Sequence, residues 1–226
     1  MPKPRRSAKP AHERRHREPP SVRARPRREK AVWPPGNLVV PAPAALISCG
    51  KPPTPPNVLA IAWCANVNSE PPMLSISVRP SRLSYGMIAR DGEFVVNLPS
   101  VREERTADYC GAVSGRKENK FSILGLTPEP IAGVGVPAIA ECPLNLACVV
   151  DRTIPLGSHD LFLARIVSVA VDESLLDARG ALNLDHANLL CFAHGFYHEL
   201  GKKRGRFGWS VKKRPGGKKG NARPSR

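Results

Sequence analysis

The sequence predicts a mainly β protein: a closed or split antiparallel barrel with a few short helices. Short runs rich in β-branched residues recur about 10 to 15 residues apart, bounded by Pro, Gly or charged residues. These runs outnumber the two helical segments, and strands and helices do not alternate regularly, which argues against a doubly wound parallel sheet. The predicted strands are 44–49, 58–67, 73–80, 93–99, 144–156 and 159–173.

Prolines define the first three strands. They crowd residues 34–56, and because proline cannot donate to a β ladder, only Ala44–Cys49 is predicted as a strand there. The next two strands, 58–67 and 73–80, flank the turn at Pro71-Pro72.

Side chains alternate along the strand after that turn. Ser75 and Ser77 share one face, and the apolar Leu74, Ile76 and Val78 share the other. The apolar face is predicted to join the core. The serine face is then a smooth polar surface on which a flat ligand lies close to backbone amides.

Two helices and a hairpin complete the predicted fold. The first helix, Ser81–Arg90, has Ser81 as its N-cap and ends at Asp91-Gly92. The second covers about Glu103–Val113. The last two strands form a long hairpin with a polar loop at Pro155–Asp160.

Charge divides the chain into three parts. Residues 1–30 hold 12 Lys and Arg against 3 acids, and residues 201–226 hold 11 against none, whereas the segment between them holds 12 against 16. The composition predicts a disordered basic arm at 1–30, a domain at 31–210 that is mildly acidic over 31–200, and a disordered basic tail at 211–226. No apolar run is long enough for a membrane span or a secretory signal, so a soluble cytoplasmic protein without membrane contact is expected.

The six cysteines are spread over more than 140 residues of a chain without an export signal, which favours reduced thiols over a disulfide framework. Cys191, His194 and His198 would share one face of a helix, but no further ligand accompanies them, so no metal site is predicted.

Residues Arg79 to Ser84 have the features of an anion site. Ser81 precedes a helix whose free N–H groups favour negative charge, Ser84 follows within one turn, and Arg79 lies beside them. The alternative is a simple capping serine beside a surface charge.

Several motifs together resemble the flavin reductase-like family, specifically its flavoredoxin branch, over roughly 39–210. They are the run from "PNVLAIAWCANV" to "FVVNLPS", then "DYCGAVSGRKENKF", "GLTPEP", "ECPLNLACVV" and "LGSHDLFLARIVSVAVDE". The resemblance implies an FMN-binding split barrel of Greek-key topology that forms a homodimer, with FMN near the dimer interface.

The resemblance also implies site residues. Trp63, Cys64, Asn66 and Ser69 match positions around the isoalloxazine ring, while Ser77, Arg79, Ser81 and Ser84 match positions that hold the FMN phosphate.

Three further positions match the family, each with an alternative reading. Asn97 is a flavin contact or a turn-forming residue, and Lys120 approaches the cofactor or the partner subunit, or is a solvated loop lysine. His159 lies in "GSH", where many relatives that use NAD(P)H have "GDH" near the nicotinamide, and Ala164 replaces a frequent glycine. An imidazole there is suited to stacking on a pyridine nucleotide or supplying a proton, or it fixes the hairpin turn.

These inferences predict an oxidoreductase that passes electrons from NADH or NADPH through FMN to a flavin, a ferric complex or another small-molecule or protein acceptor. The first alternative is an electron-transfer protein without its own NAD(P)H site. The second is a nucleic-acid-binding module that uses the basic arms. The family's usual ending accounts for Phe207 and Trp209, which argues against nucleic acid as a partner.

Overall fold

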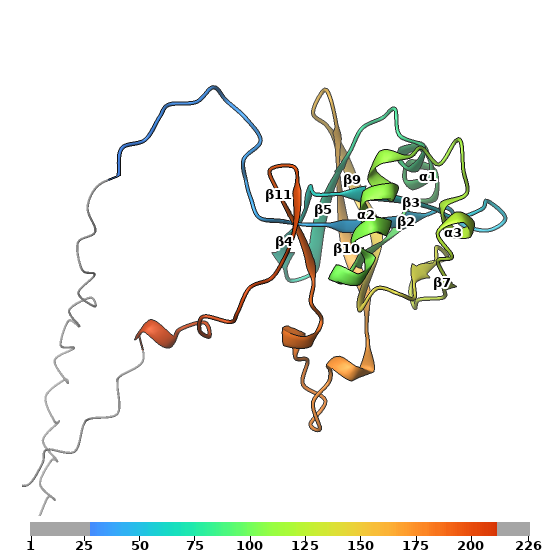
Figure 1. Cartoon of the computed structure of the whole chain (residues 1–226). Helices are drawn as coiled ribbons and strands as arrows, with labels where there is room; N and C mark the ends of the chain where they lie inside the picture. Colours follow the sequence, from blue (N-terminus) through green and yellow to red (C-terminus); the bar gives the residue numbers. More distant parts are fainter. Residues whose placement is uncertain (1–27, 212–226) are drawn as a thin grey trace, which may run out of the picture. The chain divides into compact units, whose positions relative to one another are not determined.

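The structure, a computed structural model, describes residues 28–211 (Figure 1). Within this range, Gly36–Lys202 forms one compact unit. Residues 1–27 and 212–226 lie outside the described residues, and with them nearly all of the predicted basic arm and tail.

A seven-stranded antiparallel sheet forms most of the compact unit, which confirms the mainly β prediction (Figure 1). The strands hydrogen-bond in the order β3-β2-β6-β9-β10-β5-β4, so β3 and β4 are the two edges. Their bounds are β2 Ala45–Cys49, β3 Asn57–Ile61, β4 Cys64–Ser69, β5 Pro72–Val78, β6 Glu93–Leu98, β9 Leu144–Pro155 and β10 Asp160–Val171.

The two edge strands are neighbours in the chain. Only Ala62 and Trp63 separate the end of β3 from the start of β4. Because three peptide units span at most about 11 Å, the sheet curls until its two edges approach each other. The sequence prediction of one strand over 58–67 is therefore wrong, since the chain crosses here from one edge of the sheet to the other.

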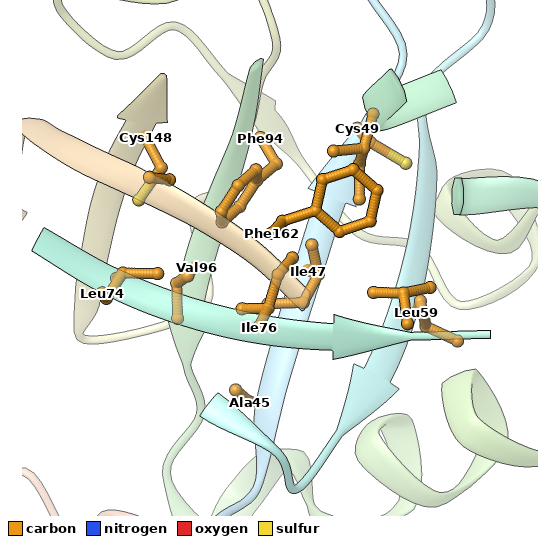
Figure 2. Close-up of a cluster of buried hydrophobic side chains, with 13 residues drawn as sticks. Ala45, Ile47, Cys49, Leu59, Leu74, Ile76, Phe94, Val96, Cys148 and Phe162 are labelled. Atoms are coloured by element: carbon orange, nitrogen blue, oxygen red, sulfur yellow. The ribbon is translucent and has the colours of Figure 1, made fainter. Parts of the chain in front are cut away.

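The core lies inside the curled sheet (Figure 2). Leu74, Ile76 and Val78 of β5 are buried, which confirms the predicted alternation with Ser75 and Ser77. Figure 2 shows Phe94 of β6 beside Phe162 of β10 within this cluster. Burying an aromatic or large aliphatic side chain contributes about 2 to 3 kcal/mol of hydrophobic stabilisation, so these residues are major contributors to fold stability.

Within the described residues, three helices lie outside the sheet: α1 Leu83–Asp91, α2 Glu104–Ala112 and α3 Lys120–Ile123. The predicted N-cap is displaced by one residue, because Arg82 occupies the cap position of α1 in extended conformation without a side-chain capping bond. The predicted stop is confirmed, since Gly92 ends α1 in the left-handed conformation with φ of 67°.

A second sheet combines β1 Ala42–Pro43, β11 Leu190–Ala193 and β12 Phe196–Glu199. β11 and β12 form a tight hairpin that turns at His194 and Gly195, both with positive φ. The helical arrangement of Cys191, His194 and His198 is therefore wrong, and Cys191 instead lies opposite His198 in the ladder.

The predicted long hairpin is confirmed. β9 and β10 pair from Pro155–Asp160 back to Leu144–Val171, and the loop between them is 156–159.

All six cysteines are free thiols, as predicted. No helix within residues 28–211 is long and apolar enough to cross a membrane. The remaining short elements are β7 Pro128–Glu129, β8 Ala138–Ile139 and the 3-10 turns η1 Val101–Glu103, η2 Glu173–Leu175, η3 Leu184–His186 and η4 Trp209–Val211.

Candidate functional site

Two cavities meet where the edges of the curled sheet approach each other. The first, of about 190 Å³, lies between β3 and the end of β5, and the second, of about 550 Å³, lies between the segment before β2 and strands β4 and β5. Both are bordered by Ala62, Trp63 and Ser77. Together they form a groove, which we call the edge groove. The first cavity is also lined by Leu59, Ala60, Ile61, Val78, Arg79, Arg82 and His159. The second is also lined by Asn37, Val39, Pro41, Ala42, Pro43, Cys64, Ala65 and Ser75.

Small side chains make the edge groove open to a flat ligand. Ala60, Ala62, Ala65, Ser75 and Ser77 line it, and none of them reaches far from the backbone. In addition, β3 and β4 are edge strands, so each presents a row of backbone N–H and C=O groups that no neighbouring strand pairs. The groove therefore offers hydrogen-bonding backbone to a planar, polar heterocycle.

Two arginines give one end of the edge groove a positive charge. Arg79 and Arg82 line the smaller cavity, and none of the ion pairs found among residues 28–211 involves either side chain. Nearby, Arg116 Nη1 donates to the Ser81 carbonyl oxygen at 2.8 Å. The predicted anion site thus includes Arg82, which sequence reasoning did not nominate although "RPSR" places two arginines three residues apart.

An aromatic pair borders the same cavity. The rings of Trp63 and His159 lie with centroids 4.5 Å apart and planes inclined by 47°. Partial burial, and secondarily the charge of Arg79, lower the pKa of His159, so the neutral imidazole predominates at pH 7. Ser158 Oγ and His159 Nδ1 are 3.0 Å apart, so this ring nitrogen is engaged by the neighbouring hydroxyl.

A hydrogen bond beneath this pair fixes the start of β10. Tyr85 of α1 donates its hydroxyl to Asp160 Oδ2 at 2.7 Å, and its ring packs edge-on against Phe162. Since Asp160 follows His159 directly, the bond joins helix α1 to the loop that carries the imidazole.

Ser84 and Lys120 do not line the edge groove. Ser84 is 1% exposed, and its Oγ accepts from Asn57 Nδ2 at 2.8 Å. Lys120 is 2% exposed, and its Nζ donates to the carbonyl oxygens of Val58 at 2.9 Å and Cys110 at 2.8 Å. Burial lowers the pKa of Lys120. Both side chains join helices to the β3 region, in place of the phosphate and cofactor contacts that the sequence predicts.

Asn97 is likewise part of the fold. Its side-chain Nδ2 donates to the Leu46 carbonyl oxygen at 2.9 Å and to Ser48 Oγ at 3.0 Å, and its Oδ1 accepts from the Ile139 amide and from Asn145 Nδ2. It is fully buried. This buried amide, which also donates to the Val95 carbonyl oxygen, has partners on five other residues; it orders β2, β6, β8 and β9 and is not part of the groove lining.

The other predicted residues divide between the groove and its surroundings. Cys64 borders the larger cavity, and burial raises the pKa of its thiol to about 11, so the thiol is protonated at neutral pH. Asn66 and Ser69 are exposed on β4 beyond the cavity linings, and Ser81 is exposed just before α1. The structure therefore brings together Trp63, Cys64, Ser77, Arg79 and His159 at the edge groove.

Comparison with known proteins identifies the family. A family model described as the flavin reductase like domain matches residues 38–201, most of the chain. The chain belongs to this flavin reductase-like family. Its match nearly coincides with the compact unit Gly36–Lys202, and it contains every residue of the edge groove except Asn37.

Solved structures share the split-barrel fold of this flavin reductase-like protein. Flavoredoxin of Desulfovibrio vulgaris (Miyazaki F) is 31% identical with a TM-score of 0.76, covering 81% of this chain and 100% of that one. Flavoredoxin from Methanosarcina acetivorans is 27% identical with a TM-score of 0.73, covering 81% and 98%. Among relatives, the FMN reductase (NADH) RutF of Bradyrhizobium diazoefficiens is 26% identical over 110 residues, which are 49% of this chain and 58% of the relative.

Proposed function

We propose that this flavin reductase-like protein binds FMN in the edge groove and passes electrons from NADH or NADPH through it to an acceptor. The observation that carries the proposal is the groove itself: small side chains and free strand edges along its length, with Arg79 and Arg82 at one end. A planar heterocycle with a phosphate tail has this distribution of shape and charge.

The residues present fit FMN. Arg79 and Arg82 would hold the phosphate, because guanidinium groups bind phosphate through charge-assisted, bidentate hydrogen bonds. Trp63, Cys64 and Ser77, with the backbone of residues 60–63, would border the ring. When bound, FMN supplies a ring that accepts a hydride and releases electrons singly or in pairs.

His159 is the proposed proton-handling residue. It borders the smaller cavity, and at pH 7 its neutral imidazole both accepts and returns a proton at Nε2. Ser158 and the Tyr85–Asp160 bond hold the loop in place, so the imidazole keeps a defined position.

The source of the electrons distinguishes two candidate functions. The similarity to RutF, whose name specifies NADH, supports direct reduction by a pyridine nucleotide. The higher similarity to flavoredoxin supports the second candidate, an electron-transfer protein without its own NAD(P)H site.

An absorption spectrum and one anaerobic titration test both candidates. The protein as purified, or after addition of FMN, is expected to show the two absorption bands of oxidised flavin, one in the near-ultraviolet and one in the blue. Anaerobic NADH or NADPH is then expected to bleach them. A bound flavin that neither nucleotide bleaches favours the electron carrier, and a protein that takes up no FMN contradicts the whole proposal.

We further propose a homodimer. Large apolar side chains are exposed beside the edge groove, including Val39, which is 94% exposed, Trp63 and Val67. A second copy that covers them would remove apolar surface from water and close the groove. Light scattering coupled to gel filtration is expected to give twice the 24.5 kDa mass of the chain, and a monomer at micromolar concentration contradicts this proposal.

A further inference from the structure

A third cavity lies behind the edge groove. Its volume is about 150 Å³, and it is open to solvent on one side and bordered by β3, helix α2 and the hairpin β11–β12. We call it the α2 cavity. It shares Ala60, Ile61 and Ala62 with the arginine-bearing cavity of the edge groove. Its other lining residues are Ala44, Ala107, Gly111, Phe192 and Tyr197.

The α2 cavity exists because its lining side chains are small. Five of the eight lining residues are alanine or glycine. Gly111 is the informative one, because neither its backbone conformation nor its surroundings require glycine. Its φ is not positive, and a Cβ added there would meet only the Ala60 Cβ, at an ordinary 3.6 Å. Alanine is the better helix former, so the open space is the structural property that glycine supplies.

One wall of the α2 cavity is aromatic. Phe192 and Tyr197 lie edge to face with centroids 5.5 Å apart and planes inclined by 67°. This geometry presents ring edges and faces to an occupant, an arrangement that favours a further aromatic ring.

Among the eight lining residues, all in the described part of the chain, Tyr197 is the one with a polar side-chain group, its hydroxyl. It reaches Asp108 Oδ1 at 3.5 Å, the long limit of a hydrogen bond, and is therefore weakly held. It is free to donate instead to an acceptor atom of a ligand. None of the described residues that line the cavity is a lysine, arginine, aspartate or glutamate, so a charged ligand would lose its hydration without compensation.

We propose that the α2 cavity binds an uncharged, single-ring aromatic molecule that carries a carbonyl oxygen, with the ring against Phe192 and Gly111 and the oxygen on the Tyr197 hydroxyl. The volume supports one ring, because a protein cavity of about 150 Å³ holds benzene. Binding itself does not depend on FMN. A role of the occupant as electron acceptor, next to the strand that borders the edge groove, rests on the proposed function.

Acetophenone is a suitable probe, since it is neutral, has one ring and one carbonyl oxygen, and does not react with lysine under mild conditions. Saturation-transfer NMR titration of the full-length protein, saturated with FMN, measures its affinity. We expect binding, and no binding of benzoate, which has the same ring and a negative charge.

Variants locate the site. Gly111→Leu fills the cavity and is expected to raise the dissociation constant of acetophenone at least about tenfold, because the ring and the new side chain exclude each other. Gly86→Leu is the matched control, since Gly86 is also within a helix and a Cβ there meets nothing within 4 Å. Tyr197→Phe is expected to weaken acetophenone about fivefold, the effect of one lost hydrogen bond, and to leave toluene unchanged. If Gly111→Leu does not fold, Gly111→Ala, which reduces the volume without strain, is expected to weaken binding measurably.

Three outcomes would overturn the inference: no acetophenone binding by the wild-type protein, equal loss in Gly86→Leu and Gly111→Leu, or displacement of acetophenone when FMN is titrated into flavin-free protein. The last outcome would assign the cavity to the flavin itself. Flavin content is measured on the same samples, so a protein that takes up no added FMN but binds acetophenone contradicts the proposed function and leaves the α2 cavity proposal intact.

Discussion

The Trp63 indole covers one side of the His159 imidazole, with ring centroids 4.5 Å apart. The contact joins the link between β3 and β4 to the loop between β9 and β10, and both residues border the smaller cavity of the edge groove. Because Trp63 is 44% exposed, the indole shields the imidazole from water while remaining at the surface itself.

Removal of this cover is expected to raise the pKa of His159. Burial is the main cause of the lowered pKa and the charge of Arg79 the second, so Trp63→Ala and Arg79→Gln both favour the protonated form. The imidazole proton resonances, followed by NMR from pH 4 to 8, report the midpoint. Trp33→Ala, which removes another exposed indole, is the control and is expected to leave the titration midpoint of His159 unchanged. An unchanged midpoint in Trp63→Ala would contradict the shielding.

The arginines are expected to distinguish FMN from riboflavin, which lacks the phosphate. Arg79→Gln and Arg82→Gln each remove a charged donor from the smaller cavity, so each should weaken FMN about tenfold. Riboflavin affinity should stay within about twofold. Fluorescence titration measures both. Arg152→Gln is the control, because Arg152 pairs with Asp151 on β9. Equal weakening of riboflavin would show that these arginines do not hold the phosphate.

Lys120 is expected to stabilise the fold. Lys120→Met leaves the carbonyl oxygens of Val58 and Cys110 without their charged donor, which should lower the free energy of unfolding by about 2 to 4 kcal/mol. Urea titration followed by circular dichroism measures the change. The exposed Lys117 provides the control variant Lys117→Met, for which about 0.5 kcal/mol or less is expected.

Asn97 is expected to affect stability and leave flavin affinity unchanged. Asn97→Ala leaves the Ile139 amide and the Asn145 side chain without their acceptor, at about 2 to 4 kcal/mol of unfolding free energy. Asn68→Ala removes an exposed asparagine bond to the Pro71 carbonyl oxygen and should have little effect. A folded Asn97→Ala protein that had lost FMN affinity would restore Asn97 as a flavin contact.

Cys64 is expected to react slowly with alkylating reagents at neutral pH. Its pKa of about 11 lies about two units above that of an ordinary thiol, so the reactive thiolate is about a hundredfold scarcer at pH 7.5. The rate should rise steadily as the pH approaches 11. Iodoacetamide labelling followed by peptide mass spectrometry measures it, with glutathione as the reference thiol. Rapid labelling at pH 7.5 would contradict a half-buried, protonated thiol.

Local patterns in the sequence were sufficient for much of the fold. The alternation in β5 showed which side chains face the core, and the proline turn and the glycine after Asp91 marked ends of elements, because these features depend on short-range backbone geometry. The break at Ala62 and Trp63 was missed. An apolar run of this kind looks like one strand until the positions of both sheet edges are known.

The candidate site divides in the same way. Arg79, Ser77 and Trp63 were identified from sequence, whereas Ser84, Asn97 and Lys120 share family positions but are buried in hydrogen-bond networks. Burial of a polar side chain depends on which distant segments pack over it, as the segments of Val58 and Cys110 do for Lys120. The spacing of residues along the chain does not predict such packing.

Patterns along the chain were enough to predict the mainly β class, the serine face of β5, the basic character of the Arg79 region and the family. The packed fold was needed to show that the two sheet edges meet at Ala62 and Trp63, that Arg82 joins Arg79 there, and that Gly111 opens a cavity next to them. The physical reason is that local patterns specify which side of an element is buried. The sites, however, form where elements far apart in the chain are packed together.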